Sequence, residues 1–145
     1  MGIITLDHIL VSPLKRISVP GGDVLHALKC TDDGFKYFGE AYFSMIESGA
    51  IKAWKMHTQM TLNLIVPIGQ VRFVFRADDG KARREELIGV ANYARLTVPR
   101  GIWFGIQGLA APFSVILNVA DIPHDPAEVM RRPLEFFACE WVEEK

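Results

Sequence analysis

The chain has 145 residues, of which 50% are hydrophobic and 23% charged, and sixteen basic against seventeen acidic residues leave a formal net charge of −1. A chain of this length buries roughly two-thirds of the surface that its unfolded form exposes, so it needs no disulfide or structural metal to fold. The balanced charge argues against a nucleic-acid binder, whose affinity comes mainly from neutralising phosphates, and the many aromatic and β-branched residues argue against disorder.

Glycine and proline interrupt the chain at short intervals, and the segments between them are rich in Val, Ile, Phe and Tyr. This spacing is typical of the many short strands of a sandwich or barrel. Turns, in which glycine supplies a positive φ and aspartate caps the backbone, are predicted at Pro20–Gly22, Asp32–Gly34, Pro67–Gln70 and Asp78–Gly80. The ten predicted strands are Leu14–Val19, Asp23–Lys29, Glu40–Ile46, Ile51–His57, Thr61–Val66, Val71–Arg76, Glu85–Val90, Tyr93–Val98, Ile102–Ile106 and Phe113–Val119.

A helix start follows the last of these strands. Asp125 supplies an N-cap, Pro126 suits the first helical position, and Glu128 places an acid in the first turn. Because Pro133 ends the segment, we expect one short C-terminal helix over Asp125–Arg131.

The tail after this helix is predicted to form either a last strand or a second helix. It covers Leu134–Val142, and we expect Phe136, Phe137 and Trp141 to dock it onto the body in either case. The chain has no internal repeat, linker or low-complexity tract, so residues 1–145 are predicted to form a single domain.

Targeting and redox signals predict a cytoplasmic protein that does not enter a membrane. The N-terminus lacks the basic region and apolar core of a signal peptide, and the apolar stretches fall far short of the roughly 20 residues that span a bilayer. Cys30 and Cys139 form no CxxC motif, which excludes a zinc knuckle or a thioredoxin-type site and is typical of two reduced thiols.

The strand predicted at Ile51–His57 carries the first candidate chemistry. Side chains alternate between the two faces of a strand, so Lys55 and His57 share one face, while Lys52 and Trp54 share the other. If the first face lines a barrel interior, it brings a cation and an imidazole into a cavity.

Four short motifs, in this order and spacing, carry a resemblance to a known family. They are Phe38-Gly39-Glu40 after Asp33-Gly34, Met56-His57-Thr58-Gln59, Gly69-Gln70-Val71 and Pro99-Arg100-Gly101. In these motifs the chain resembles the dTDP-4-dehydrorhamnose 3,5-epimerase family and the related sugar-nucleotide ketoisomerases, over roughly residues 23 to 130. The resemblance implies an all-β fold, the cupin-type double-stranded β-helix (a jelly-roll β-sandwich), to which the short C-terminal helix is added.

The resemblance also implies a function and a partner. It implies an isomerase that acts on a dTDP-4-keto-6-deoxy sugar by removing a proton next to the keto group, in cell-surface polysaccharide or deoxysugar biosynthesis. It further implies a homodimer, in which the N-terminal strands of one subunit reach the site of the other. Apolar residues on both faces of Glu40–Ile46 and Thr61–Val66 favour the same assembly.

The motifs also indicate candidate site residues. His57 is the candidate base, because imidazole titrates near neutral pH, and Lys55 is the candidate stabiliser of the enolate oxygen. The alternatives are a hydrogen-bonded histidine on a barrel wall and a surface lysine. The candidate substrate-binding residues, each of which could equally serve packing, a salt bridge or solvation, are Glu40, Gln59, Asn63, Arg76 and Arg100.

The chain also departs from the family pattern. Trp54 stands in place of an arginine, a characteristic lysine falls near Leu62, Phe104 stands in place of a second histidine, and the catalytic tyrosine falls at Ile116 or Leu117. The acid that orients the family's histidine has no clear counterpart. These departures predict one-sided chemistry, which is exchange or epimerisation at one carbon, or ketone migration.

The residues leave other functions open. Metal cupins use several histidines and a glutamate around one ion, whereas this chain offers His57 with Gln59 in the first motif and Phe104 in the second, so we expect no metal and no cofactor. The alternatives are a 3,4-ketoisomerase, a non-catalytic cupin that binds a sugar nucleotide or a partner enzyme, and a dimerisation module whose barrel is filled by Phe73, Phe75 and Phe104.

Overall fold

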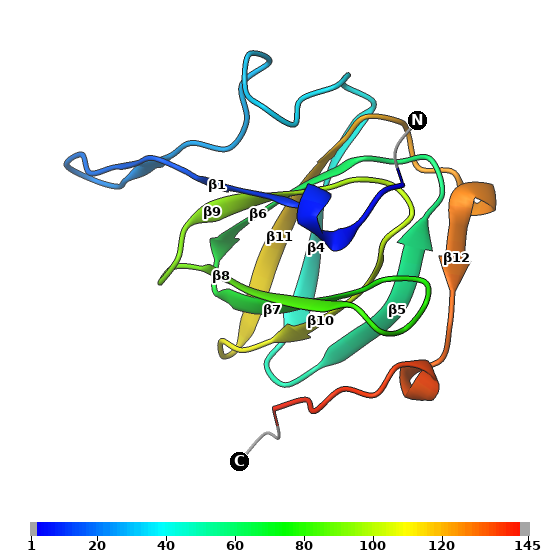
Figure 1. The fold of residues 1–145 in the computed structure, drawn as a ribbon. Helices are drawn as coiled ribbons and strands as arrows, with labels where there is room; N and C mark the ends of the chain where they lie inside the picture. The colour runs from blue at the N-terminus through cyan, green and yellow to red at the C-terminus, as the bar shows by residue number, and fades with distance from the viewer. Residues whose placement is uncertain (1–2, 143–145) are drawn as a thin grey trace.

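Two five-stranded antiparallel sheets face one another in the computed structural model, which describes residues 3–142 (Figure 1). The first sheet has the order β1 (Leu10–Pro13), β9 (Ala94–Val98), β6 (Leu62–Ile68), β11 (Phe113–Ala120), β4 (Glu40–Glu47). The second has the order β12 (Val129–Arg131), β5 (Ile51–His57), β10 (Trp103–Gly108), β7 (Gln70–Arg76), β8 (Arg83–Gly89). This arrangement confirms the all-β jelly-roll sandwich that the sequence predicts.

The core fills part of the space between the sheets, because alternate residues of each strand point inward. On β6 the inward set is Leu62, Leu64 and Val66, and on β7 it includes Phe73 and Phe75, all at most 5% exposed. The strand predictions from β4 to β11 follow this alternation, and the structure places each of them within a few residues of its predicted bounds.

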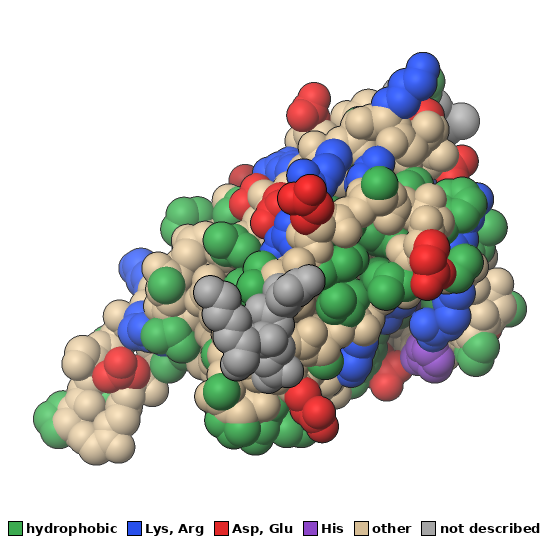
Figure 2. All heavy atoms as spheres, turned by 90° about the horizontal axis from the view of Figure 1, so that it is seen from below, with side chains coloured by type: hydrophobic (Ala, Val, Ile, Leu, Met, Phe, Trp, Pro, Cys, Tyr) green, Lys and Arg blue, Asp and Glu red, His purple; other side chains and the backbone are tan. Residues whose placement is uncertain are grey.

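The N-terminal strands differ from the prediction. The two segments predicted as long strands shrink to β2 (Arg16–Ile17) and β3 (Val24–Leu25), which form a hairpin that stands away from the sheets (Figures 1 and 2). The strand that joins the first sheet is β1, which lies at the sheet edge and ends in Pro13. Proline has no amide hydrogen to donate and is tolerated at an edge, so its presence hid this strand.

The predicted C-terminal helix is reduced to one turn. The Asp125 side chain accepts a hydrogen bond from the backbone N–H of Ala127 at 3.0 Å, as an N-cap should. Only the 3₁₀ turn η2 (Pro126–Glu128) forms, however, and β12 follows at once by pairing with β5. Pairing with an existing strand outweighs a local helix signal of one turn.

The following segment, residues 132–142, crosses the outer face of the second sheet, and we call it the C-terminal strap (red in Figure 1). Near its start lies the short turn η3 (Leu134–Phe136). Phe137 is buried and Trp141 half-buried against the sheet, whereas Phe136 keeps 49% of its surface exposed. The docking role predicted for Phe137 and Trp141 is therefore confirmed. The tail is neither a regular strand nor an α-helix.

The strap is fixed by polar contacts as well as by its aromatic rings. Gln107 on β10 exchanges two hydrogen bonds with the backbone of Val142, at 2.6 and 2.9 Å. Arg72 and Arg76 on β7 each donate a hydrogen bond of 2.8 Å to a strap carbonyl, those of Glu140 and Ala138. The strap is therefore part of the folded body over its described length.

Candidate active site

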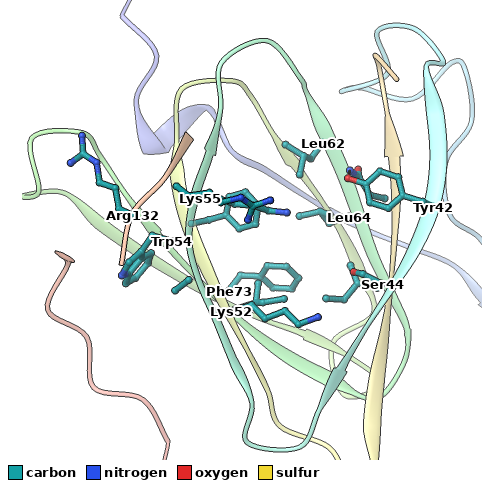
Figure 3. A pocket seen from close by; sticks show the side chains of 15 residues that line it. Tyr42, Ser44, Lys52, Trp54, Lys55, Leu62, Leu64, Phe73 and Arg132 are labelled. Carbon is teal, nitrogen blue, oxygen red and sulfur yellow. Dashed lines mark hydrogen bonds between the residues drawn. The ribbon is translucent and has the colours of Figure 1, made fainter. Parts of the chain in front are cut away.

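A partly open cavity of about 400 Å³ lies between the two sheets (Figure 3). Phe73 and Phe104 line it but do not fill it, which argues against the alternative of a barrel filled by Phe73, Phe75 and Phe104. The apolar wall consists of Ala53, Trp54, Leu62, Leu64, Phe73, Phe104, Ile106 and Ile116. The polar lining consists of Tyr42, Ser44, Lys52, Lys55, Asn118, Arg131 and Arg132.

The polar lining is cationic. It contains no carboxylate among the described residues, and three of its cations, Lys52, Lys55 and Arg131, come from β5 and β12. Arg132 turns its guanidinium away and places it over the rings of Trp103 and Phe136, at 4.5 and 4.0 Å from the centroids (Figure 3). A cavity with this lining favours a ligand that carries negative charge beside an apolar part.

A buried His–Glu pair adjoins the cavity. His57, the last residue of β5, hydrogen-bonds through Nδ1 to Oε2 of Glu128 at 2.5 Å, and both side chains are about 2% exposed. The other carboxylate oxygen accepts hydrogen bonds from the backbone N–H groups of Met60 and Gln59, at 2.9 and 3.1 Å. Nε2 of His57 is buried and has no hydrogen-bond partner within residues 3–142.

The surroundings set the protonation of this pair. Burial lowers the pKa of His57 below its usual value, although the hydrogen bond and charge of Glu128 act in the opposite direction. Burial acts to raise the pKa of Glu128, but the hydrogen bonds from His57, Met60 and Gln59 outweigh it and the pKa lies below its usual value. At neutral pH the imidazole is therefore neutral and the carboxylate is ionised.

Phe104 joins the histidine to the cavity. Its ring lines the cavity and stacks on that of His57, with centroids 6.3 Å apart, and the Nζ of Lys55 lies 5.6 Å from the same ring. Burial lowers the pKa of Lys55, and the nearby charges of Arg131 and Lys52 lower it further, while Glu128 acts to raise it. The structure thus brings together the two residues that the sequence assigned to catalysis.

The opposite wall carries a hydroxyl group. Tyr42 on β4 lies across the cavity from Lys55 (Figure 3), and its hydroxyl oxygen accepts a hydrogen bond of 3.0 Å from the Asn118 side chain. The hydroxyl hydrogen is not used in that bond and can be donated to a ligand. The family motif places a tyrosine near Ile116, so the motif alone does not find Tyr42.

Lys52 is on the cavity side of β5, contrary to the prediction from alternation. Lys55 is paired with Phe104 and Lys52 with Ile106, so β5 has one residue more than β10 in this interval and the alternation shifts. Lys52 and Lys55 therefore both reach toward the cavity. Trp54 also belongs to the lining, but its side chain extends to the other side of the strand and packs against Phe137 (Figure 3).

The five candidate substrate-binding residues lie outside the cavity lining. Glu40 accepts a hydrogen bond of 2.8 Å from the backbone N–H of His124. Gln59 is exposed, and its contact with the site is the hydrogen bond that its backbone N–H donates to Glu128. Arg100 is exposed in the turn before β10.

Asn63 and Arg76 serve the packing of loops and strap instead. Asn63 points to the outer side of β6, where it donates to the Gly34 carbonyl and accepts from the Thr97 hydroxyl. Arg76 binds the carbonyls of Ala138 and Gly80 on the outer side of β7. In both strands the inward positions belong to apolar neighbours, which is why these polar side chains face outward.

Glu128 is the candidate site residue that the sequence reasoning missed. It is 71 positions from His57, and the local pattern around it indicates only a helix start. A usable signal lies in the next three residues, because Val129-Met130-Arg131 can pair with β5 and so place the preceding carboxylate beside the end of that strand.

Neither a cluster of metal ligands nor a membrane-spanning helix is found among residues 3–142. These residues contain no group of three or more His, Cys, Asp or Glu side chains that could hold a metal ion. Their helices are single turns, and none meets the length and apolarity that a membrane crossing requires.

Comparison with known proteins identifies similar solved structures. A dTDP-sugar isomerase from Desulfovibrio desulfuricans G20 is 32% identical, with a TM-score of 0.85 over 90% of this chain and 87% of that one. A sugar 3,4-ketoisomerase from Thermoanaerobacterium thermosaccharolyticum, in complex with TDP, is 15% identical, with a TM-score of 0.75 over 88% and 90%. A dTDP-6-deoxy-D-glucose-3,5-epimerase from Legionella pneumophila, in complex with dTDP-4-keto-L-rhamnose, is 14% identical, with a TM-score of 0.75 over 95% and 86%.

No protein-family model and no curated protein sequence matches the chain. The ketoisomerase and the epimerase share its fold at low identity. The likeness to the Desulfovibrio protein is closer and extends over nearly all of both chains, and it shows that this chain belongs to the cupin-fold family of dTDP-sugar isomerases.

Proposed function

We propose that the protein is an isomerase that acts on a dTDP-4-keto-6-deoxy sugar by proton transfer next to the keto group. The observation that carries this proposal is the buried His57–Glu128 pair beside a cavity lined by cations. The similar proteins support the substrate class, since one of them is in complex with TDP and another with dTDP-4-keto-L-rhamnose.

In the proposed mechanism, His57 is the base. Its neutral imidazole holds a hydrogen on Nδ1 toward Glu128, so the lone pair on Nε2 is free to take a proton from the carbon next to the ketone. The electron pair of the broken C–H bond moves to form a C=C bond, and the carbonyl electrons move to oxygen. Glu128 remains ionised and stabilises the imidazolium that results.

Lys55 is proposed to stabilise the enolate oxygen. It presents an ammonium group in a half-buried position, where its charge interacts more strongly with a developing negative charge than it would in water. Lys52 and Arg131 are proposed to bind the diphosphate, because they add charge to the same wall of the cavity.

The product depends on where the proton returns. Return to the same carbon from the opposite face gives epimerisation, and Tyr42 lies on the wall opposite Lys55, where it could supply that proton. Return to the former carbonyl carbon gives ketone migration, the second candidate, provided that the hydroxyl on the neighbouring carbon gives its proton to the enolate oxygen and so becomes the new ketone. It is favoured by the apolar side chains of Leu62, Phe104 and Ile116 at positions where the epimerase pattern has polar ones.

The direct test is incubation with dTDP-4-keto-6-deoxyglucose in deuterium oxide, followed by NMR. We expect deuterium next to the ketone and, over time, either an inverted carbon or a ketone at the neighbouring position. Binding of TDP without any exchange would instead favour the non-catalytic cupin. Absence of TDP binding to the wild-type protein would contradict the proposed function altogether.

The cellular compartment belongs to the same proposal. Both described cysteines are unpaired, with Cys30 exposed and Cys139 partly so, which fits a reducing compartment. We place the reaction in the cytoplasm on this ground.

A further inference from the structure

A β-bulge in β5 determines which side chains face the cavity. The pairs Lys55–Phe104 and Lys52–Ile106 leave Ala53 and Trp54 opposite the single residue Gly105. In a regular strand, residues three positions apart point to opposite faces. The extra residue puts Lys52 and Lys55 on the same face, and bulges beside active sites often redirect a side chain in this way.

Trp54 is the residue of the bulge that is anchored. Its indole N–H donates a hydrogen bond of 2.9 Å to the Leu134 carbonyl in the strap, and its backbone exchanges bonds of 3.0 and 3.1 Å with Arg132. Its ring meets that of Phe137 edge-on, with centroids 5.2 Å apart, and is only 1% exposed. The strap therefore holds this side chain on the outer face of the second sheet.

Gly105 provides the space that the bulge needs. A Cβ at this position would lie 2.6 Å from the Cβ of Ala53 and 3.1 Å from the Trp54 ring. The strand opposite the bulge could not approach so closely with any larger residue.

We propose that Trp54 is a positioning residue of the candidate site: anchored by the C-terminal strap, it holds the bulge that turns Lys52 to the cavity beside Lys55. Lys52 extends to the rim, where its Nζ donates a hydrogen bond of 2.7 Å to the Met45 carbonyl at the far wall. The part that Lys52 plays in binding a diphosphate rests on the proposed function, whereas its placement by Trp54 does not.

The test compares two tryptophans. Trp54→Phe removes the bond to Leu134 and keeps a ring against Phe137. Trp103→Phe is the matched control, because Trp103 is fully buried, donates a bond of 2.9 Å to Asp78 and also packs against Phe137, but lies outside the bulge and the cavity lining. In calorimetry, we expect Trp54→Phe to weaken TDP binding about threefold to tenfold, which is the change in affinity that the loss of one net hydrogen bond produces. Trp103→Phe should leave TDP affinity unchanged.

A double-mutant cycle shows whether Trp54 acts through Lys52. In the Lys52→Met background, Trp54→Phe should have little further effect on TDP affinity, because the ammonium group that Trp54 positions is already absent. Equal effects of Trp54→Phe in both backgrounds, or equal effects of the two Trp→Phe variants, would overturn the proposal.

A measurement without ligand separates this inference from the proposed function. The charges of Arg131 and Lys52 help to lower the pKa of Lys55, while Glu128 acts against them. NMR titration of ¹³C-methylated lysines should therefore show a higher Lys55 pKa in both Lys52→Met and Trp54→Phe, and no further rise in the double variant. If the wild-type protein fails to bind TDP, the proposed function fails, but this titration still tests whether Trp54 positions Lys52. An unchanged Lys55 pKa in Trp54→Phe would refute the positioning role.

Discussion

Glu128 acts on His57 in two ways. Its carboxylate accepts the Nδ1 hydrogen and so fixes the tautomer that leaves Nε2 as a base. Its charge also favours the protonated imidazole, which offsets part of the lowering of the pKa by burial. The pair therefore combines a fixed orientation with a base that stays neutral at physiological pH.

The first prediction concerns the base itself. His57→Asn should reduce solvent-deuterium incorporation next to the ketone by ~10²- to 10⁴-fold, the usual contribution of general base catalysis. TDP affinity should change little, because TDP has no sugar carbon for His57 to act on and its diphosphate is proposed to be bound by Lys52 and Arg131. Lys55→Met should slow the same exchange through lost stabilisation of the enolate. Wild-type exchange rates in His57→Asn would contradict the assignment of the base.

The second prediction uses the pH dependence of the rate. The acid limb reports protonation of His57, and Glu128 acts to raise that pKa, so Glu128→Gln should move the limb to lower pH. The maximal rate should fall, because the amide no longer stabilises the imidazolium.

The matched control for this variant is Glu40→Gln. Glu40 also holds a backbone N–H, that of His124, but lies outside the cavity lining. Its pH–rate profile should coincide with that of the wild type. An acid limb that moves to higher pH in Glu128→Gln would contradict the assignment of this limb to His57 and of Glu128 as the group that raises its pKa.

Residue-scale prediction from the sequence succeeded where local alternation holds. Lys55 and His57 are two positions apart without an intervening irregularity, and both lie against Phe104. Glu128 was missed because its pairing with His57 depends on a contact between distant segments, which no local pattern encodes.

At the scale of elements, strands were predictable and their irregularities were not. β4 to β11 show alternating or continuous apolar runs bounded by turns, which fixes their position in the sequence. The bulge in β5 arises from Trp54 fitting against the strap, and β12 from pairing with β5, so both depend on tertiary contacts.

The third prediction tests the bulge as an element. Gly105→Ala should lower the free energy of unfolding by about 1–3 kcal/mol in urea denaturation, because its Cβ overlaps that of Ala53. The double variant Gly105→Ala with Ala53→Gly removes the nearer overlap and should recover part of the loss. If Gly105→Ala is as stable as the wild type, the close approach of the two strands is not required.

At the scale of the whole molecule, an apolar patch lies on the outer face of the first sheet. Phe43 and Met45 on the edge strand β4 are 68% and 53% exposed, and they pair with Leu117 and Val115 on β11, beside the exposed Ile68. These five residues form the patch. Contiguous apolar surface of this kind usually marks an interface, and the commonest one is a two-fold contact between identical copies.

The fourth prediction is therefore a homodimer through this patch. Light scattering at micromolar concentration should give twice the chain mass for the wild type and a single mass for the double variant Phe43→Glu, Met45→Glu. Leu87→Glu is the control, because Leu87 is 47% exposed on β8 of the second sheet and should leave the dimer intact. A monomeric wild-type protein would refute the assembly.

The position of Glu128 in the sequence has a consequence for shortened chains. The strands of both sheets other than β12 precede it, and the strap that anchors Trp54 comes after it. A chain that ended before Glu128 would still carry these strands and most of the residues that line the cavity. In such a chain His57 would have no carboxylate to orient its ring, so the cavity would hold a base that is not oriented.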